Sequence, residues 1–231
     1  SVMGVNVVKG LQCTDANQKY DKIHACAKHF AVHSGPEWNR HEFNAENIKP
    51  RDLHETYLVP FEALVKEAKV KEVMCAYNRL EGNPCCGSDR LLMQILRQEW
   101  GYEGIVLSDC GAIDDFYREK GHKTHPDAES ASAAAVLSGT DLECGSSYKA
   151  LVESAKKGLI SEKDIDVSVK RLLKARFELG EMDDPSKVEW TKIPYSVVCS
   201  AEHDSLSLDI ARKSMTLLLN KNNILPLKRG G

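Results

Sequence analysis

The chain has 231 residues, of which 42% are hydrophobic, enough to bury the core of one domain or of a large part of one. Its 31 basic and 34 acidic side chains are spread along the sequence and give a net charge of -3, so it lacks the clustered positive charge on which nucleic-acid binding depends. No run of about 18 apolar residues occurs, so the sequence predicts no membrane span and no membrane partner.

Short apolar runs alternate with longer amphipathic segments along the chain. The apolar runs predict four strands, at residues 25–32, 73–77, 104–108 and 140–143. The other segments predict helices at residues 51–68, 89–100, 127–138, 148–157 and 161–179. This alternation is typical of a parallel sheet flanked by helices.

Local signals mark the course of these helices. Pro60 lies inside the first of them and is expected to bend it, because proline has no backbone N–H group to donate. Ser161 and Asp164 have the spacing of a capping box, so they predict the start of the last helix. Gly180 follows that helix, in a position where glycine commonly ends one.

The pattern changes after Gly180. Residues 1–180 are interpreted as part of one α/β domain, and residues 181–231 as a C-terminal extension and linker towards a second domain that the chain does not contain. The second segment predicts a helix at residues 205–213 and an apolar strand at residues 216–219.

The predicted fold class is α/β, with parallel strands and flanking helices forming part of a TIM-like (β/α)8 barrel. Four predicted strands are half of the eight in a closed barrel. An open half would expose sheet edges and apolar surface. We therefore expect the missing barrel half to come from a longer parent chain or from a homo-oligomer.

The sequence contains eight cysteines and no CxxC pair, which argues against a small disulfide scaffold. A free thiol beside a strand usually behaves as a small buried hydrophobe, and this is the expectation for four of them. These are Cys26, Cys75, Cys110 and Cys144. The alternative is a disulfide bridge that involves Cys85, Cys86 or Cys110.

Each of the four predicted strands ends in polar residues, and in parallel α/β folds the working residues lie at such strand ends. Asp109 ends the run 104–108, and Gly111 lets the chain turn away, so the carboxylate can attack an electrophile or bind a cation. Alternatively, Asp109 caps a helix or accepts backbone hydrogen bonds. Lys28 and His29 can bind hydroxyl groups; alternatively, they are a surface lysine and a hydrogen-bonded core histidine.

Three ordered motifs resemble glycoside hydrolase family 3: ACAKHFAV at residues 25–32, VMCAYNR at residues 73–79 and WGYEGIVLSD at residues 100–109. The resemblance covers nearly the whole chain, and the order and spacing are far more specific than any one motif. It implies that residues 1–180 are about the last half of the catalytic barrel of a larger enzyme.

The resemblance implies a retaining β-glycoside hydrolase. Asp109 would attack the anomeric carbon and form a covalent glycosyl-enzyme, which water then hydrolyses. Lys28 and His29 would hold the non-reacting hydroxyl groups of the substrate. Tyr77 would steady the nucleophile or the substrate, and Met74 would form part of the pocket wall. No cofactor and no metal enters this mechanism.

The general acid stays unassigned. It should lie about 5–5.5 Å from the nucleophile, and members of this type usually supply it from a second domain after the barrel. Glu37, Glu81 and Glu143 are present, but none matches the family's acid motif. The isolated chain is therefore expected to have negligible glycosidase activity, whereas the full-length parent should hydrolyse β-glycosides.

One departure from the family bears on the sugar. Many members have tryptophan after the nucleophile, but Cys110 stands here, and the run 31–38 is more similar to the xylosidase-leaning members. The expected substrate is an oligosaccharide or β-glycoside that carries a β-D-xylosyl or β-D-glucosyl residue at its non-reducing end. Relatives that degrade polysaccharides are commonly exported, so a periplasmic or secreted parent is expected.

Three alternatives remain from the sequence. A β-N-acetylhexosaminidase of the same family would use His33 in a His-Asp pair, but residues 35–37 lack the rest of that loop motif. A metal-binding or redox protein would use His29, His33 and Glu37 together with the cysteines. A non-catalytic carbohydrate-binding fragment would hold the nucleophile without its acid.

Overall fold

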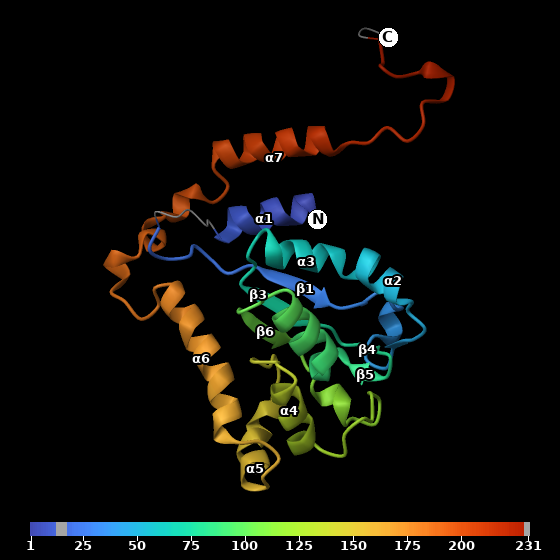
Figure 1. Cartoon of the computed structure of the whole chain (residues 1–231). Helices are drawn as coiled ribbons and strands as arrows, with labels where there is room; N and C mark the ends of the chain where they lie inside the picture. Colours follow the sequence, from blue (N-terminus) through green and yellow to red (C-terminus); the bar gives the residue numbers. More distant parts are fainter. Residues whose placement is uncertain (13–17, 229–231) are drawn as a thin grey trace. The chain divides into compact units, whose positions relative to one another are not determined.

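Three of the predicted strands form one parallel sheet in the computed structural model, which describes residues 1–12 and 18–228 (Figure 1). The sheet order is β1 (Cys26–Phe30), β3 (Glu72–Cys75) and β6 (Ile105–Ser108). The fourth predicted strand is reduced to one parallel bridge between Leu107 and Leu142. Spatial order therefore follows chain order, as in the wall of a (β/α) barrel.

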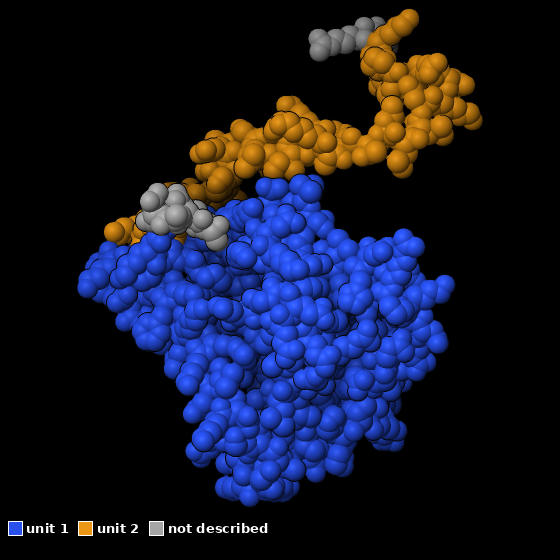
Figure 2. All heavy atoms as spheres, viewed as in Figure 1, with its two compact units in different colours: residues 1–188 blue, residues 189–231 orange. Residues whose placement is uncertain are grey.

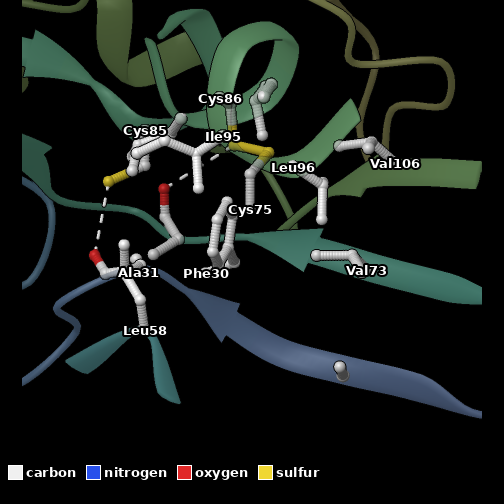
Figure 3. Packing of buried hydrophobic residues seen from close by; sticks show 14 of the residues in the cluster. Phe30, Ala31, Leu58, Val73, Cys75, Cys85, Cys86, Ile95, Leu96 and Val106 are labelled. Atoms are coloured by element: carbon white, nitrogen blue, oxygen red, sulfur yellow. Dashed lines mark hydrogen bonds between the residues drawn. A yellow bond between two sulfur atoms is a disulfide. The ribbon is translucent and has the colours of Figure 1, made fainter. Parts of the chain in front are cut away.

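The two faces of this sheet differ in burial. On one face Phe30, Val73 and Val106 are fully buried, and they pack against Ile95 and Leu96 of the neighbouring helix (Figure 3). Successive side chains of a strand point to opposite faces. The opposite face, which includes Met74 and Leu107, is only partly buried, and Leu142 of the adjoining bridge is 43% exposed. Helices thus cover one face of the sheet and leave the other open.

The predicted helix at residues 51–68 is divided into three segments. These are α2 (Pro50–Asp52), a π-helical segment η2 (Leu53–Tyr57) and α3 (Val59–Lys66). Pro60 lies in the first turn of α3, where its missing N–H group needs no partner within the helix. The helix therefore restarts at the proline instead of continuing through it.

The other predicted helices of the first 180 residues are all present. They are the π-helical η4 (Arg90–Glu99), α4 (Ala128–Leu137), α5 (Leu151–Lys156) and α6 (Glu162–Glu178). The Ser161 hydroxyl and the Asp164 carboxylate form the predicted capping box at the start of α6, and Gly180 follows its end with φ of 77°. An unpredicted helix, α1 (Val2–Gln12), precedes the sheet.

A second, smaller sheet was not predicted. It joins β2 (Asn44–Ala45), β4 (Arg79–Leu80) and β5 (Asn83–Pro84), with β2 parallel to β4. These strands have two residues each, too short to give a periodic pattern. Short helical turns complete the described chain: η1 (Glu37–Asn39), η3 (Cys85–Gly87), η5 (Asp114–Phe116), η6 (Ser147–Ala150), η7 (Pro185–Lys187), η8 (Glu189–Lys192), η9 (Tyr195–Val197) and η10 (Lys221–Asn223).

Two disulfides correct the expectation of free thiols at three positions. Cys75 pairs with Cys86, and Cys110 pairs with Cys144, as the alternative involving Cys86 or Cys110 anticipated. Cys26 has the expected free thiol. Position beside a strand predicted burial correctly for Cys75, but it gave no information about which loop returns to that strand end. The Cα atoms lie 5.1 Å and 4.4 Å apart in the two pairs.

The Cys110–Cys144 disulfide closes a longer loop than Cys75–Cys86, with sequence separations of 34 and 11 residues. Removing it with the double substitution C110S/C144S is expected to destabilise the protein by roughly 4 kcal/mol, and C75S/C86S by roughly 3 kcal/mol, because the longer loop restricts the unfolded chain more. Thermal unfolding of the full-length parent would measure both. An equal or reversed order would contradict the chain-entropy argument.

Residues 189–231 form a unit separate from the compact unit of residues 1–188 (Figure 2). The predicted helix at 205–213 lies within α7 (Ala201–Ser214), which Ser200 caps. The predicted strand at 216–219 is wrong: these residues are exposed and form no strand. An apolar run without a neighbouring strand has no backbone partner with which to form a sheet. No helix of the described residues has the length and apolarity that a membrane crossing requires. That residues 181–231 lead to a second domain stays a prediction.

Candidate active site

The strand ends bring Asp109 and His29 together. Asp109 directly follows β6, His29 lies near the end of β1, and β3 lies between the two strands. The His29 Nε2 atom lies 3.3 Å from Asp109 Oδ2. The Asp109 side chain is 12% exposed and the His29 side chain 26% exposed. The pair is therefore largely buried but still accessible to a small ligand.

Backbone hydrogen bonds hold Asp109 in place. Its N–H donates to the carbonyl of Cys75 at 3.2 Å, and its Oδ1 accepts from the N–H of Cys110 at 2.9 Å. Gly111 then turns the chain with φ of 75° and donates to the carbonyl of Cys144 at 2.7 Å. The alternative of a backbone acceptor thus holds for Oδ1, while Oδ2 faces His29. One oxygen orients the carboxylate and the other is available for chemistry.

His29 stands where the regular strand is interrupted. The pairing register between β1 and β3 shifts between Ala27 and Phe30, so Lys28 and His29 lie where the regular pleat is interrupted. Burial lowers the pKa of His29, although the Asp109 carboxylate opposes this. The imidazole is therefore neutral at neutral pH and can donate or accept a hydrogen bond.

Tyr77 follows β3 and reaches the turn that carries the nucleophile. Its hydroxyl donates to the carbonyl of Cys110 at 2.7 Å. Burial raises the pKa of Tyr77, and the nearby Asp109 carboxylate raises it further, so the phenol keeps its proton. The structure therefore brings His29 and Tyr77 to Asp109. Lys28 is exposed on β1, and Met74 is half-buried on the open face of β3.

Three residues beside Tyr77 were missed from the sequence. The Arg40 guanidinium carbon lies 5.0 Å from the centroid of the Tyr77 ring, and the His41 ring meets it edge-on at 4.5 Å. Asp115 binds His41, with 2.8 Å between Oδ2 and Nδ1. The polar residues of segment 37–42 could have indicated a functional role. However, nothing in the local sequence shows that this segment packs against Tyr77.

The glutamates considered for the general acid are engaged elsewhere. Glu37 binds Arg40 at the surface, and Glu81 accepts from the N–H of Ile48 at 3.0 Å. Glu143 accepts from the backbone N–H groups of Ser147 and Tyr148 at 2.8 and 2.6 Å. Both oxygens of the Glu143 carboxylate are thus occupied by backbone hydrogen bonds, and the acid stays unassigned.

The residues of the metal-binding alternative do not form a common site. The His29 and His33 rings lie 4.9 Å apart, but the Glu37 carboxylate is turned to Arg40. Elsewhere in the described chain, Asp21, His24 and Glu178 lie close enough together to bind an ion. The Lys71 ammonium already lies 2.7 Å from Asp21 and 3.0 Å from Glu178, so these carboxylates have a cation.

Residues 1–175 match the N-terminal domain of glycosyl hydrolase family 3. The chain belongs to glycoside hydrolase family 3. It is 58% identical over 231 residues to a xylan 1,4-beta-xylosidase of Xylanibacter ruminicola, covering 99% of this chain and 26% of that protein. It is 36% identical over 224 residues to beta-D-xylosidase 1 of Arabidopsis thaliana, covering 95% and 28%.

Solved structures of the family agree with the fold. A GH3 exo-beta-xylosidase in complex with a xylobiose aziridine probe superposes with a TM-score of 0.90 and 30% identity, covering 99% of this chain and 30% of that chain. A beta-glucosidase from Listeria innocua in complex with isofagomine superposes with a TM-score of 0.85 and 29% identity, covering 97% of this chain and 31% of that chain. The predicted family and α/β fold are confirmed. The chain spans less than a third of the length of these relatives.

Proposed function

We propose that the full-length parent of this family 3 chain is a retaining β-glycosidase whose nucleophile is Asp109. The observation that carries the proposal is the orientation of the Asp109 carboxylate. Its Oδ1 accepts a hydrogen bond from the Cys110 N–H group, and its Oδ2 lies 3.3 Å from His29 Nε2. A nucleophile needs such a fixed orientation and a free lone pair.

In the first step, Asp109 forms a bond to the anomeric carbon while the bond to the leaving oxygen breaks. That oxygen takes a proton from a general acid outside this chain. In the second step, water attacks the anomeric carbon, the bond to Asp109 breaks, and the acid residue takes the proton from the water. The His29 imidazole and the Tyr77 hydroxyl stay uncharged, which suits hydrogen bonding to a neutral sugar. Lys28 would bind further hydroxyl groups, and Met74 would line the pocket.

The proposed substrate is an oligosaccharide or β-glycoside with a xylosyl or glucosyl residue at its non-reducing end. Two relatives that match nearly the whole of this chain are named as β-xylosidases, which favours xylose as the sugar. A periplasmic or secreted parent is also proposed, and the two disulfides support it because such bonds persist in oxidising compartments.

Mechanism-based labelling of the parent tests this proposal. Incubation with 2-fluoro-xylosyl and 2-fluoro-glucosyl inactivators, followed by mass spectrometry of peptides, is expected to place the label on Asp109, with faster labelling by the xylosyl compound. Labelling of another carboxylate would refute the assignment. Folded protein that takes no label from either compound would favour the hexosaminidase alternative or a carbohydrate-binding role.

The isolated 231-residue chain is expected to have negligible glycosidase activity, because the general acid and the cover of the open sheet face lie elsewhere. The missing barrel half would come from the parent chain or from a second copy. Hydrolysis of an aryl β-xyloside by the isolated chain and by the parent would compare the two. Turnover by the isolated chain at the parent's rate would contradict this expectation.

A further inference from the structure

The small sheet places a polar segment over Tyr77. Because β2 pairs with β4, the N–H of Arg79 donates to the carbonyl of Phe43 at 2.9 Å, and its guanidinium donates to the carbonyl of Glu42 at 2.9 Å. The two residues before Glu42, Arg40 and His41, both contact the Tyr77 ring. The strand pairing therefore fixes the backbone of this segment, and side-chain contacts must orient its two functional groups.

Those contacts form a directed chain of hydrogen bonds. The Asp115 side chain is 2% exposed, and its Oδ2 lies 2.8 Å from His41 Nδ1. The Nε–H group of Arg40 donates to His41 Nε2 at 3.2 Å. A ring nitrogen that accepts a hydrogen bond has no proton, so Nδ1 must hold it and donate it to Asp115. Asp115 thereby selects the tautomer whose other nitrogen binds Arg40.

Asp115 is committed to this contact. The neighbouring carboxylate of Asp114 is bound by Arg118 and by the hydroxyl of Ser147. Burial raises the pKa of Asp115, but the hydrogen bond from His41 opposes that change. A buried carboxylate that binds an imidazole nitrogen in this way is typical of residues that orient a histidine.

Arg40 lies within electrostatic reach of the site. Its charge contributes to lowering the pKa of His29 and acts against the rise in the pKa of Tyr77. We propose that Asp115 and His41 form a positioning pair, which holds the Arg40 guanidinium over Tyr77 and within electrostatic reach of His29. The guanidinium also pairs with the exposed Glu37 carboxylate. This inference rests on the proposed glycosidase function, and displacement of a site group by about 1 Å can cost on the order of 10²-fold in rate.

Three substitutions at His41 in the full-length parent separate positioning from folding. H41F keeps a ring against Tyr77 but loses both nitrogens. H41N keeps a donor near the Nδ1 position and loses the acceptor for Arg40, whereas H41Q supplies an oxygen near the Nε2 position. With rates normalised to active sites titrated by the 2-fluoro inactivator, H41F and H41N should lower kcat/KM by about 10²-fold. H41Q should recover much of the loss.

A double-mutant cycle shows whether His41 acts through Arg40. If it does, H41N should change kcat/KM by less than about 2-fold in an R40M background, because the interaction is already gone. Independent, multiplicative effects of H41N and R40M would overturn the proposal. The proposal would also be overturned if H41Q lost as much activity as H41N. The matched control is H54F at an exposed histidine, which should retain wild-type activity.

A spectroscopic test needs no activity. Long-range 1H–15N spectra of the histidine-labelled parent, with H41F to assign the signal, should show His41 as the neutral Nδ1–H tautomer. The Nε2–H tautomer would refute the positioning pair. If the wild-type parent neither hydrolyses xylosides nor reacts with the 2-fluoro inactivator, the proposed function fails. The His41 tautomer still tests the Asp115–His41 pair independently of that outcome.

Discussion

Replacing Asp109 with asparagine in the full-length parent is expected to lower kcat by about 10³-fold or more, since the amide cannot attack the anomeric carbon. The amide side chain has nearly the same shape as the carboxylate, and its carbonyl oxygen can still accept the hydrogen bond that Cys110 N–H gives to Oδ1. The fold should therefore survive. Steady-state hydrolysis of an aryl β-xyloside and a thermal unfolding curve would measure the two effects.

The smaller substitution D109G gives a sharper version of this test. Azide should enter the space of the missing carboxylate and attack in its place, which would restore turnover and yield a glycosyl azide of α configuration. The matched control is D89N, at an exposed aspartate that accepts a side-chain hydrogen bond from Gln94. Retention of more than about a tenth of wild-type kcat by D109N, against the loss expected for a nucleophile, would exclude Asp109 from that role.

Replacing Asp141 with asparagine is expected to cause the largest loss of stability of the single substitutions considered. Its fully buried carboxylate binds Arg97 at 2.6 Å and Arg171 at 2.7 Å. It also accepts from the backbone N–H of Val106 at 2.9 Å and the hydroxyl of Ser168 at 3.0 Å. D141N would leave the Arg97 charge buried without its partner, which should lower the free energy of unfolding by roughly 3–5 kcal/mol.

Thermal or urea unfolding of the parent, followed by a signal that reports on the barrel, would measure this loss. D166N, at an exposed aspartate of α6, is the matched control and should change stability by less than about 0.5 kcal/mol. If D141N and D166N unfold alike, the ion pairs around Asp141 contribute little net stability, and its role lies in specifying how α6 packs on the sheet.

Local signals determined most of the elements from the sequence alone. The run 104–107 followed by Asp109 predicted a strand with a carboxylate at its end. Apolar residues favour a buried strand, and the polar residues that follow them mark where the strand ends. The capping box of Ser161 and Asp164 lies within one helical turn, so no distant contact was needed to predict it. Parallel strand ends meet at one edge of a sheet, which is why the candidate site residues were sought at the strand ends.

Only the tertiary structure decided what depends on where distant segments meet. The Cys75–Cys86 and Cys110–Cys144 pairs depend on how distant loops meet. The local sequence had predicted buried free thiols at three of these positions, Cys75, Cys110 and Cys144. The place of Arg40 and His41 over Tyr77 follows from pairing between two-residue strands, which leave no periodic pattern. Conversely, residues 216–219 have the composition of a strand but no partner strand. A strand needs backbone hydrogen bonds to a neighbouring strand, and composition alone cannot predict that neighbour.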